Sequence, residues 1–155
     1  MKIQLLCVGR TREPFLRDGI EKYLRYLRPY GDIEITEVRE ERIADLKDAP
    51  SVRRREAERI GRALTDGMVI ALDEGGKEFT SHEFAQFLSD SLDRGVRKMV
   101  FIIGGALGLD ESVTTRAGTV IALSRWTVTH EMARIVLLEQ LYRAFTIIKG
   151  KPYHY

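Results

Sequence analysis

The sequence predicts an α/β domain built on a mostly parallel sheet with helices on both of its faces. Three runs of large apolar residues carry this prediction, at residues 68–73, 98–105 and 119–124. Such near-continuous runs are typical of strands that are buried on both faces, as in parallel sheets covered by helices. The segments between the runs have helical patterns, and alternation of strands with helices indicates the α/β class.

The N-terminal third follows the same alternation. Residues 3–8 form an apolar run that predicts a buried strand, and Gly9 ends it. A helix is expected from Pro14 to Leu27, since proline suits the first turn and apolar residues then recur at helical spacing. Residues 32–40 alternate between apolar and acidic, which predicts a strand with one solvated face. Residues 40–50 are charged and aperiodic and predict a mobile loop, and Ser51 is expected to cap a helix that runs to about residue 65.

The C-terminal half supplies the remaining helices. Thr80 and Glu83 have the spacing of a capping box, and Gly95 stands where that helix would end. A short helix is expected over residues 110–118 and a long one from Thr129. The long helix is apolar on nearly every side, which favours burial of part of it in a subunit interface. Without repeats or a composition break, we expect one domain over residues 1–155 and no separate RNA-binding domain.

Composition narrows the class of protein. Cys7 is the only cysteine, so a disulfide within the chain is excluded, and a buried thiol in a reducing cytoplasm is expected. The first apolar run is too short for a signal peptide, and no run approaches the roughly 20 residues of a membrane span, so we expect a cytoplasmic protein that does not contact a membrane.

The net charge of +2 is small, but its distribution is uneven. Six basic and two acidic residues follow residue 111, and residues 51–62 include five arginines. Such faces can bind phosphates. The alternative is a solvated helix face on which Arg55 and Arg59 are balanced by Glu56 and Glu58.

The glycine-rich segment after the run 98–103 predicts a ligand site. In a parallel α/β sheet, ligands bind beyond the carboxyl ends of the strands, here residues 72–76, 103–106 and 123–127. The spacing G-G-x-x-G fails the dinucleotide fingerprint, and no P-loop, spaced metal-ligand set or G-x-S-x-G motif is present. S-adenosylmethionine suits a turn that has no phosphate cradle. The alternatives are that the glycines only let the chain turn and that Trp126 is a core residue.

Several motifs resemble a known family over the whole chain. They are "MKIQLLCVGR", "IALDEGGKEFTS", "FIIGGALGLDESV", "ALSRWTVTHEMARIVLLEQLYRAFTI" and the terminal "KPYHY". Together, and in this order, they resemble the RlmH type of SPOUT methyltransferase. The resemblance implies a C-terminal trefoil knot, a homodimer with a shared active site, and methylation of N3 of a pseudouridine in 23S ribosomal RNA by S-adenosylmethionine. It implies a partner in the ribosome or its large subunit, and neither DNA nor a metal.

The resemblance also implies site residues. The cofactor pocket would include the following residues: Leu72, Gly104, Gly105, Ser124, Arg125, Trp126, Thr127, Val128 and Thr129. Many family members have a small or aliphatic residue where Trp126 stands.

Three residues near the C-terminus are our candidates for the chemistry. We expect His154 to accept a proton, Arg143 to stabilise negative charge or hold a phosphate, and Tyr153 to stack on the base or hydrogen-bond to it. The alternative for this tail is packing on a dimer partner. His130 follows a helix cap, and we expect it to be structural.

Two rival functions stay open at this point. A SPOUT enzyme could act on another RNA, such as a transfer RNA, or the chain could be a ribosome-associated module that binds the cofactor without catalysis. A flavodoxin-like or dinucleotide-binding domain is disfavoured by the missing fingerprints.

Overall fold

The computed structural model describes residues 1–153 of the chain. Within that range one five-stranded, fully parallel sheet has the strand order β2-β1-β4-β3-β5. The strands are β1 (Lys2–Val8), β2 (Asp32–Val38), β3 (Met68–Glu78), β4 (Lys98–Ile103) and β5 (Thr119–Ala122). This confirms the predicted α/β class and the parallel sheet.

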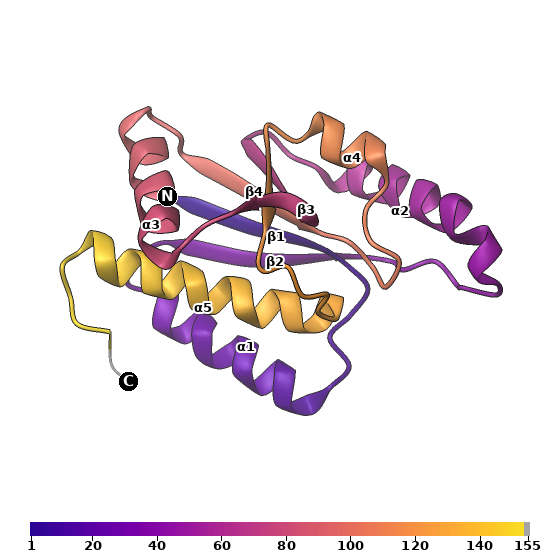
Figure 1. Ribbon diagram of the computed structural model, residues 1–155. Coiled ribbons are helices and arrows are strands. Elements are labelled where there is room, and N and C mark those ends of the chain that lie inside the picture. Colours follow the sequence, from indigo (N-terminus) through magenta and orange to yellow (C-terminus); the bar gives the residue numbers. More distant parts are fainter. Residues whose placement is uncertain (154–155) are drawn as a thin grey trace.

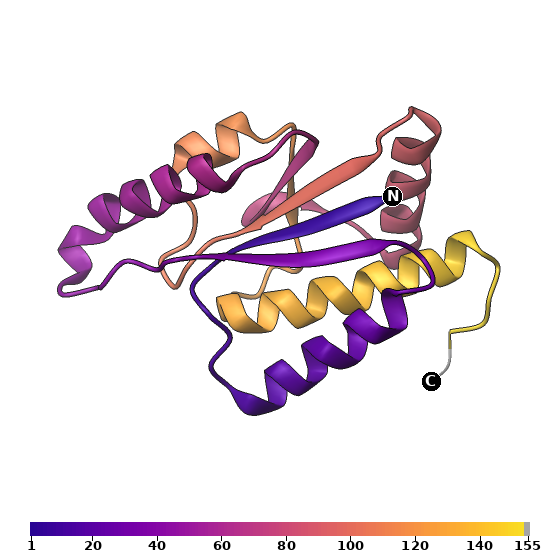
Figure 2. The same cartoon turned by 180° about the vertical axis from the view of Figure 1, so that it is seen from behind.

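Helices cover both faces of the sheet, as expected (Figure 1). One face carries α1 (Pro14–Leu27), α3 (Ser81–Asp93) and α5 (His130–Ile148), and the other carries α2 (Ala49–Ala63) and α4 (Glu111–Arg116). The reverse view shows α1 and α5 lying side by side along the sheet (Figure 2). The position of β3 and β5 at one edge, with α4 and α5 on opposite faces, is consistent with the expected C-terminal knot.

The central strands explain the continuous apolar runs. Along β1, Leu5 and Cys7 face the larger cluster beneath α1, α3 and α5, whereas Leu6 and Val8 face the smaller cluster beneath α2 and α4. All four side chains are buried. Burial raises the pKa of the Cys7 thiol to about 12, so the thiol stays protonated at neutral pH, as expected for an inert core residue.

Side-chain caps set several helix boundaries where the sequence predicts them. The Thr80 hydroxyl accepts the Glu83 N–H while the Glu83 carboxylate accepts the Thr80 N–H, which completes the predicted capping box of α3. The Asp110 side chain caps α4 by accepting the Ser112 N–H, and the Thr129 side chain caps α5 by accepting the Met132 N–H.

Two boundary predictions are wrong. Ser51 does not cap α2, because the helix begins at Ala49 with Pro50 in its first turn, where the fixed φ of proline fits. The expected loop over residues 40–50 also contains a 3-10 turn, η1 (Leu46–Asp48), which the Asp45 side chain caps. The segment before it is tied to α2 by Glu41, which pairs with both Arg55 and Arg59.

No helix in the described part of the chain is long and apolar enough to cross a membrane.

Candidate functional site

The main cavity lies at the irregular middle part of β3 and beyond the carboxyl ends of β4 and β5, next to the segments where the strand pattern predicts a ligand site. Its volume is about 910 Å³, which lies within the usual range for small-molecule sites. The segments 72–74, 103–109 and 123–129 form most of its wall, and the starts of α1 and α5 and Arg53 of α2 supply the rest.

The glycine turn after β4 is tight enough to require glycine. A Cβ on Gly104 would lie 2.9 Å from the backbone carbon of Gly108, and one on Gly105 would lie 2.9 Å from Oε2 of Glu56. Gly108 has a φ of +78°, and its N–H donates to the Gly105 carbonyl at 3.1 Å. The turn therefore exposes backbone to the cavity without side chains in the way.

The irregular middle part of β3 supplies a second part of the wall. The pairing of β3 with β5 breaks between Leu72 and Lys77, so residues 73–76 leave the regular ladder. Gly76 makes this path possible, because a Cβ there would lie 2.7 Å from the backbone of Ile121.

The segment after β5 is fixed by three polar contacts. Ser124 Oγ accepts the Trp126 N–H at 3.1 Å and donates to the Trp126 carbonyl at 3.0 Å. Thr127 Oγ1 donates to Oε2 of Glu74, in the irregular part of β3, at 2.8 Å. These contacts hold the segment's backbone while the Trp126 side chain remains 84% exposed at the cavity wall. The alternative that Trp126 is a core residue is therefore wrong.

Eight of the nine predicted cofactor residues, all of them within residues 1–153, line this cavity. They are Leu72, Gly104, Gly105, Ser124, Trp126, Thr127, Val128 and Thr129. Arg125 is the exception: its side chain points away and pairs with Glu78 at 3.1 Å. The chain bends at residues 125 and 126, and the ion pair with Glu78 holds the Arg125 side chain apart from its neighbours.

The opposite wall was not foreseen from the sequence. It is made by Glu13 and Leu16 at the start of α1, and by His130 and Glu131 at the start of α5. Glu131 Oε2 accepts the backbone N–H groups of Arg12 and Glu13, at 2.9 and 3.2 Å. A local sequence pattern cannot predict a contact between residues that lie 119 positions apart.

The charge state of this wall follows from its contacts. Burial and the nearby Arg134 guanidinium lower the pKa of His130, so the imidazole is neutral at pH 7. Burial opposes ionisation of Glu131, but its two backbone hydrogen bonds outweigh that effect and lower its pKa. His130 thus adds no positive charge to the cavity, and Glu131 adds a negative one.

Arg134 of α5 fixes the loop of residues 9–13 through hydrogen bonds. Its side chain is fully buried, and Nη2 donates to the carbonyls of Val8 and Gly9 at 2.7 and 2.9 Å. Nη1 donates to Thr11 Oγ1 at 2.9 Å and lies 3.4 Å from Glu37 Oε1. One turn of α5 therefore holds this loop through both Glu131 and Arg134.

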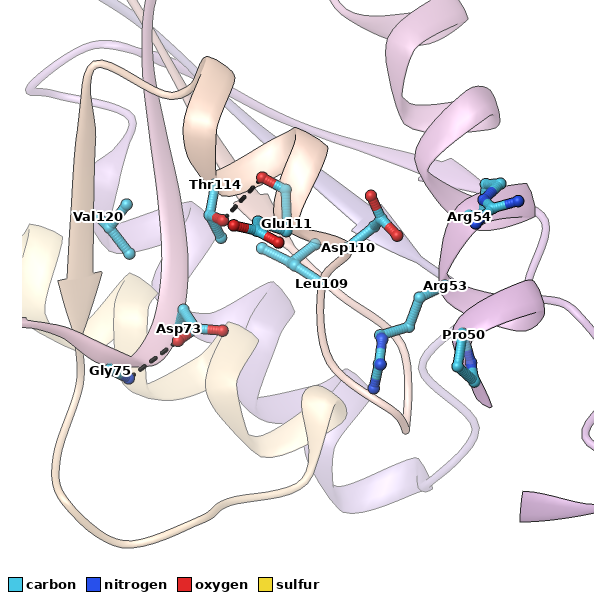
Figure 3. A pocket seen from close by; sticks show the side chains of 10 residues that line it. All are labelled: Pro50, Arg53, Arg54, Asp73, Gly75, Leu109, Asp110, Glu111, Thr114 and Val120. Carbon is cyan, nitrogen blue, oxygen red and sulfur yellow. Dashed lines mark hydrogen bonds between the residues drawn. The ribbon is translucent and has the colours of Figure 1, made fainter. Parts of the chain in front are cut away.

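A second cavity of about 540 Å³ adjoins the first and shares three wall residues with it, Arg53, Asp73 and Leu109. It lies between α2, α4 and the irregular part of β3 (Figure 3). Asp73 accepts the Gly75 N–H at 2.9 Å, and Asp110 is engaged in capping α4. Its wall therefore mixes guanidinium groups with carboxylates, two of which already have partners.

The predicted catalytic residues lie at the other end of α5. Glu139 Oε1 accepts hydrogen bonds from Arg143 Nη2 at 2.6 Å and from Tyr153 Oη at 2.8 Å. The Arg143 guanidinium also lies 3.9 Å from the centre of the Tyr153 ring. His154 lies outside the described residues. Sequence reasoning missed Glu139, although its spacing of four from Arg143 was a usable signal.

These contacts set the protonation states of Arg143 and Tyr153. The hydrogen bond with Glu139 raises the pKa of Arg143. Burial, with the same carboxylate, raises the pKa of Tyr153, so its phenol is a hydrogen-bond donor at neutral pH. Thr129 and Arg143 are fourteen residues apart, which corresponds to roughly 21 Å along a helix. The tail cluster and the cavity of one chain are therefore well separated.

Within residues 1–153, no group of three or more His, Cys, Asp or Glu side chains is placed to hold a metal ion.

Comparison with known families identifies the class of protein. Residues 1–154 match the sequence profile of a family described as "Predicted SPOUT methyltransferase". The chain belongs to this family.

Individual relatives match along the whole chain. A protein from Geobacter sp. (strain M21), named ribosomal RNA large subunit methyltransferase H, is 46% identical over 100% of this chain and 99% of its own length. A protein of the same name from Symbiobacterium thermophilum is 45% identical over 99% of both chains.

Solved structures support the fold. A probable methylase family protein from Haemophilus influenzae aligns with a TM-score of 0.56 and 15% identity, over 99% of this chain and 70% of that one. A putative methylase family protein from Neisseria gonorrhoeae aligns with a TM-score of 0.53 and 14% identity, over 99% and 85%.

Proposed function

We propose that this protein is a methyltransferase that uses S-adenosylmethionine to methylate the RNA of the large ribosomal subunit. The relatives that match its full length carry that activity in their name. The observation in the structure that supports it is a cavity of suitable size on a glycine turn, at the strand ends where the family resemblance expects the cofactor.

The charge of the cavity favours a cationic ligand. Four carboxylates line it, from Glu13, Asp73, Glu74 and Glu131, against the single guanidinium of Arg53. S-adenosylmethionine carries a sulfonium and an ammonium against one carboxylate, so it is a net cation. A pyrophosphate would be repelled by such a wall, which argues against a dinucleotide.

The family resemblance narrows the reaction to transfer of a methyl group to N3 of a pseudouridine in 23S ribosomal RNA. The cofactor would supply an electrophilic methyl group. Alignment of the reacting atoms supplies much of the acceleration in such a transfer. The N3 proton must leave, and His154 is proposed as its acceptor, with Arg143 stabilising the developing anion. Tyr153, a donor at neutral pH, would hydrogen-bond to the base.

A homodimer would bring these groups together. Because the cavity and the Arg143–Tyr153 cluster lie at opposite ends of α5, a complete site needs the cavity of one chain and the tail of another. Apolar side chains remain exposed near the cavity, including Trp126, Phe15 and Val128 at 84%, 65% and 41%. A second copy that covers them would gain apolar burial and complete the site.

The RNA would be held by the dimer itself, without a separate RNA-binding domain. Phosphate contacts position such a substrate, and exposed basic residues on α1 and α2 are available for them. Binding to the large subunit should then weaken steeply with salt.

Transfer of tritium from labelled S-adenosylmethionine to ribosomes that lack the modification tests this function. Label in N3-methylpseudouridine of 23S RNA is expected. Label in another nucleoside would mean that the protein is a methyltransferase with a different target nucleotide. Cofactor binding with no label on ribosomes, subunits or free RNA would overturn the proposal and leave a non-catalytic binding module.

A further inference from the structure

We propose that Glu13 binds the α-ammonium group of the cofactor, which makes it a binding residue on the wall opposite the glycine turn. This inference rests on the proposed function, because it assumes that S-adenosylmethionine occupies the main cavity. Glu13 lies outside every motif that predicted the pocket.

Glu13 is the carboxylate of this cavity that its neighbours leave available. Asp73 accepts the Gly75 N–H, Glu74 accepts the Thr127 hydroxyl, and Glu131 accepts two backbone N–H groups. The Glu13 carboxylate has no hydrogen-bond or ion-pair partner in the part of the chain that the structure describes. Its side chain therefore keeps its acceptor capacity for a ligand.

The local structure fixes the backbone of Glu13 while leaving its side chain free. Glu13 is the N-cap residue of α1, yet its side chain makes no capping hydrogen bond. Its N–H is bound by Glu131, and its carbonyl accepts from Leu16 and Arg17 in the first turn of α1. The amino end of a helix also favours a negative charge at this position.

The rest of the loop is rigidly supported. Arg134 holds the carbonyls of Val8 and Gly9 and the hydroxyl of Thr11. Because both ends of residues 9–13 are tied to α5, Glu13 is held beside His130 and Glu131 at the cavity wall. Such preorganisation lowers the entropic cost of binding.

Chemistry assigns Glu13 to the ammonium rather than to the sulfonium. An ammonium has three N–H donors for a carboxylate, whereas a sulfonium has none. A carboxylate against the sulfonium would also stabilise the reactant cation more than the transition state, in which that charge is being lost. The ammonium keeps its charge through the reaction, so binding it imposes no such penalty.

Binding of three ligands to Glu13→Gln tests the assignment. S-adenosylmethionine and S-adenosylhomocysteine both contain the ammonium, whereas 5′-methylthioadenosine lacks the whole amino-acid part. Calorimetric titration should show about tenfold weaker binding of the first two ligands and unchanged binding of the third, as expected for loss of one charge-assisted hydrogen bond. The matched control is Glu21→Gln, an exposed position farther along α1, which should bind all three ligands like the wild type.

The other outcomes overturn the proposal. Weaker binding of S-adenosylmethionine alone would assign Glu13 to the sulfonium, and equal weakening of all three ligands would mean a general change in pocket shape. Unchanged binding would remove Glu13 from the site. If Glu13→Gln fails to fold, Glu13→Asp retains the charge on a shorter side chain, and a loss confined to the two ammonium ligands is again required. Failure of the wild type to bind S-adenosylmethionine would instead refute the proposed function.

Discussion

Replacement of Arg134 by methionine should destabilise the fold more than replacement of any exposed arginine. The Arg134 side chain is fully buried and donates to Val8, Gly9 and Thr11 while pairing with Glu37. Methionine fills a similar space but donates no hydrogen bond. The two carbonyls at the end of β1 would then stay buried without these partners.

The magnitude follows from opposing terms. Hydrogen bonds to a charged donor contribute about 1.5–3 kcal/mol each, so four such contacts give a gross gain of roughly 6–12 kcal/mol. Burying the guanidinium costs several kcal/mol. Its Nε has no hydrogen-bond partner among residues 1–153, which adds to that cost. Leaving a buried acceptor without a hydrogen bond costs about 1–3 kcal/mol, and two carbonyls lose their donor here, so we expect Arg134→Met to lose about 2–6 kcal/mol.

Urea unfolding at one fixed protein concentration measures this effect, since dimerisation would otherwise contribute to the apparent stability. Arg134→Lys keeps the charge but loses the planar fork, and should lose about 2 kcal/mol. The control is Arg97→Met, at an exposed position just before the amino end of the central strand β4, with an expected change within about 0.5 kcal/mol. A loss below about 1 kcal/mol for Arg134→Met would refute the view that this side chain holds the loop.

Three further substitutions test the site. Gly104→Ala places a methyl group 2.9 Å from backbone of the turn and should weaken S-adenosylmethionine binding at least tenfold. Gly118→Ala, whose methyl group would make only an ordinary van der Waals contact with the Val69 carbonyl at 3.8 Å, should bind normally in the same titration. Burial raises the pKa of Glu56, so the folded state retains its proton to higher pH than the unfolded state. The free energy of unfolding of the wild type, relative to that of Glu56→Gln, should therefore fall as pH rises above the usual pKa of glutamic acid. Urea unfolding of both proteins at pH 4 and pH 7 measures this. The same difference between the two proteins at both pH values would contradict the prediction. Glu139→Ala removes the carboxylate that positions both Arg143 and Tyr153 and should lower methyl transfer to ribosomes at least tenfold while leaving cofactor affinity unchanged; weakened cofactor binding would contradict the separation of the two clusters.

The fold was predictable because its determinants are local. The apolar runs of β1, β3 and β4 report burial on both faces, and the capping pair Thr80 and Glu83 reports the start of α3. The start of α2 was misplaced because Ser51 is a good cap in isolation, whereas Pro50 extends the helix before it. The N-cap preference of a single residue therefore predicts the start of a helix only where no neighbouring residue allows the helix to begin elsewhere.

Only one of the two walls of the candidate site could be predicted from the sequence. Its glycine turn and the segment after β5 follow the strand ends, so pattern and family resemblance point to the same residues. The opposite wall depends on contacts between residues 9–13 and α5, which link the two ends of the sequence. The basic run on α2 was also open to two interpretations. Arg55 and Arg59 in fact pair with Glu41 from the preceding loop, whereas Glu56 is buried, so neither i, i+4 pairing along the helix nor a free basic face describes it fully.

Helix α5 connects the two halves of the proposed chemistry. Its first turn shapes the cavity through Glu131 and Arg134, and its last turns carry Glu139 and Arg143, which hold Tyr153. In one chain Arg143 is paired with Glu139, which positions it, so an RNA phosphate or a developing anion would have to compete with that carboxylate. In the proposed dimer, a partner chain whose cavity holds the cofactor would bring the anionic RNA to this cluster and supply that competing charge. Catalysis in this small fold would therefore depend on assembly, and a variant that unfolds neither chain but prevents dimerisation should bind the cofactor without transferring its methyl group.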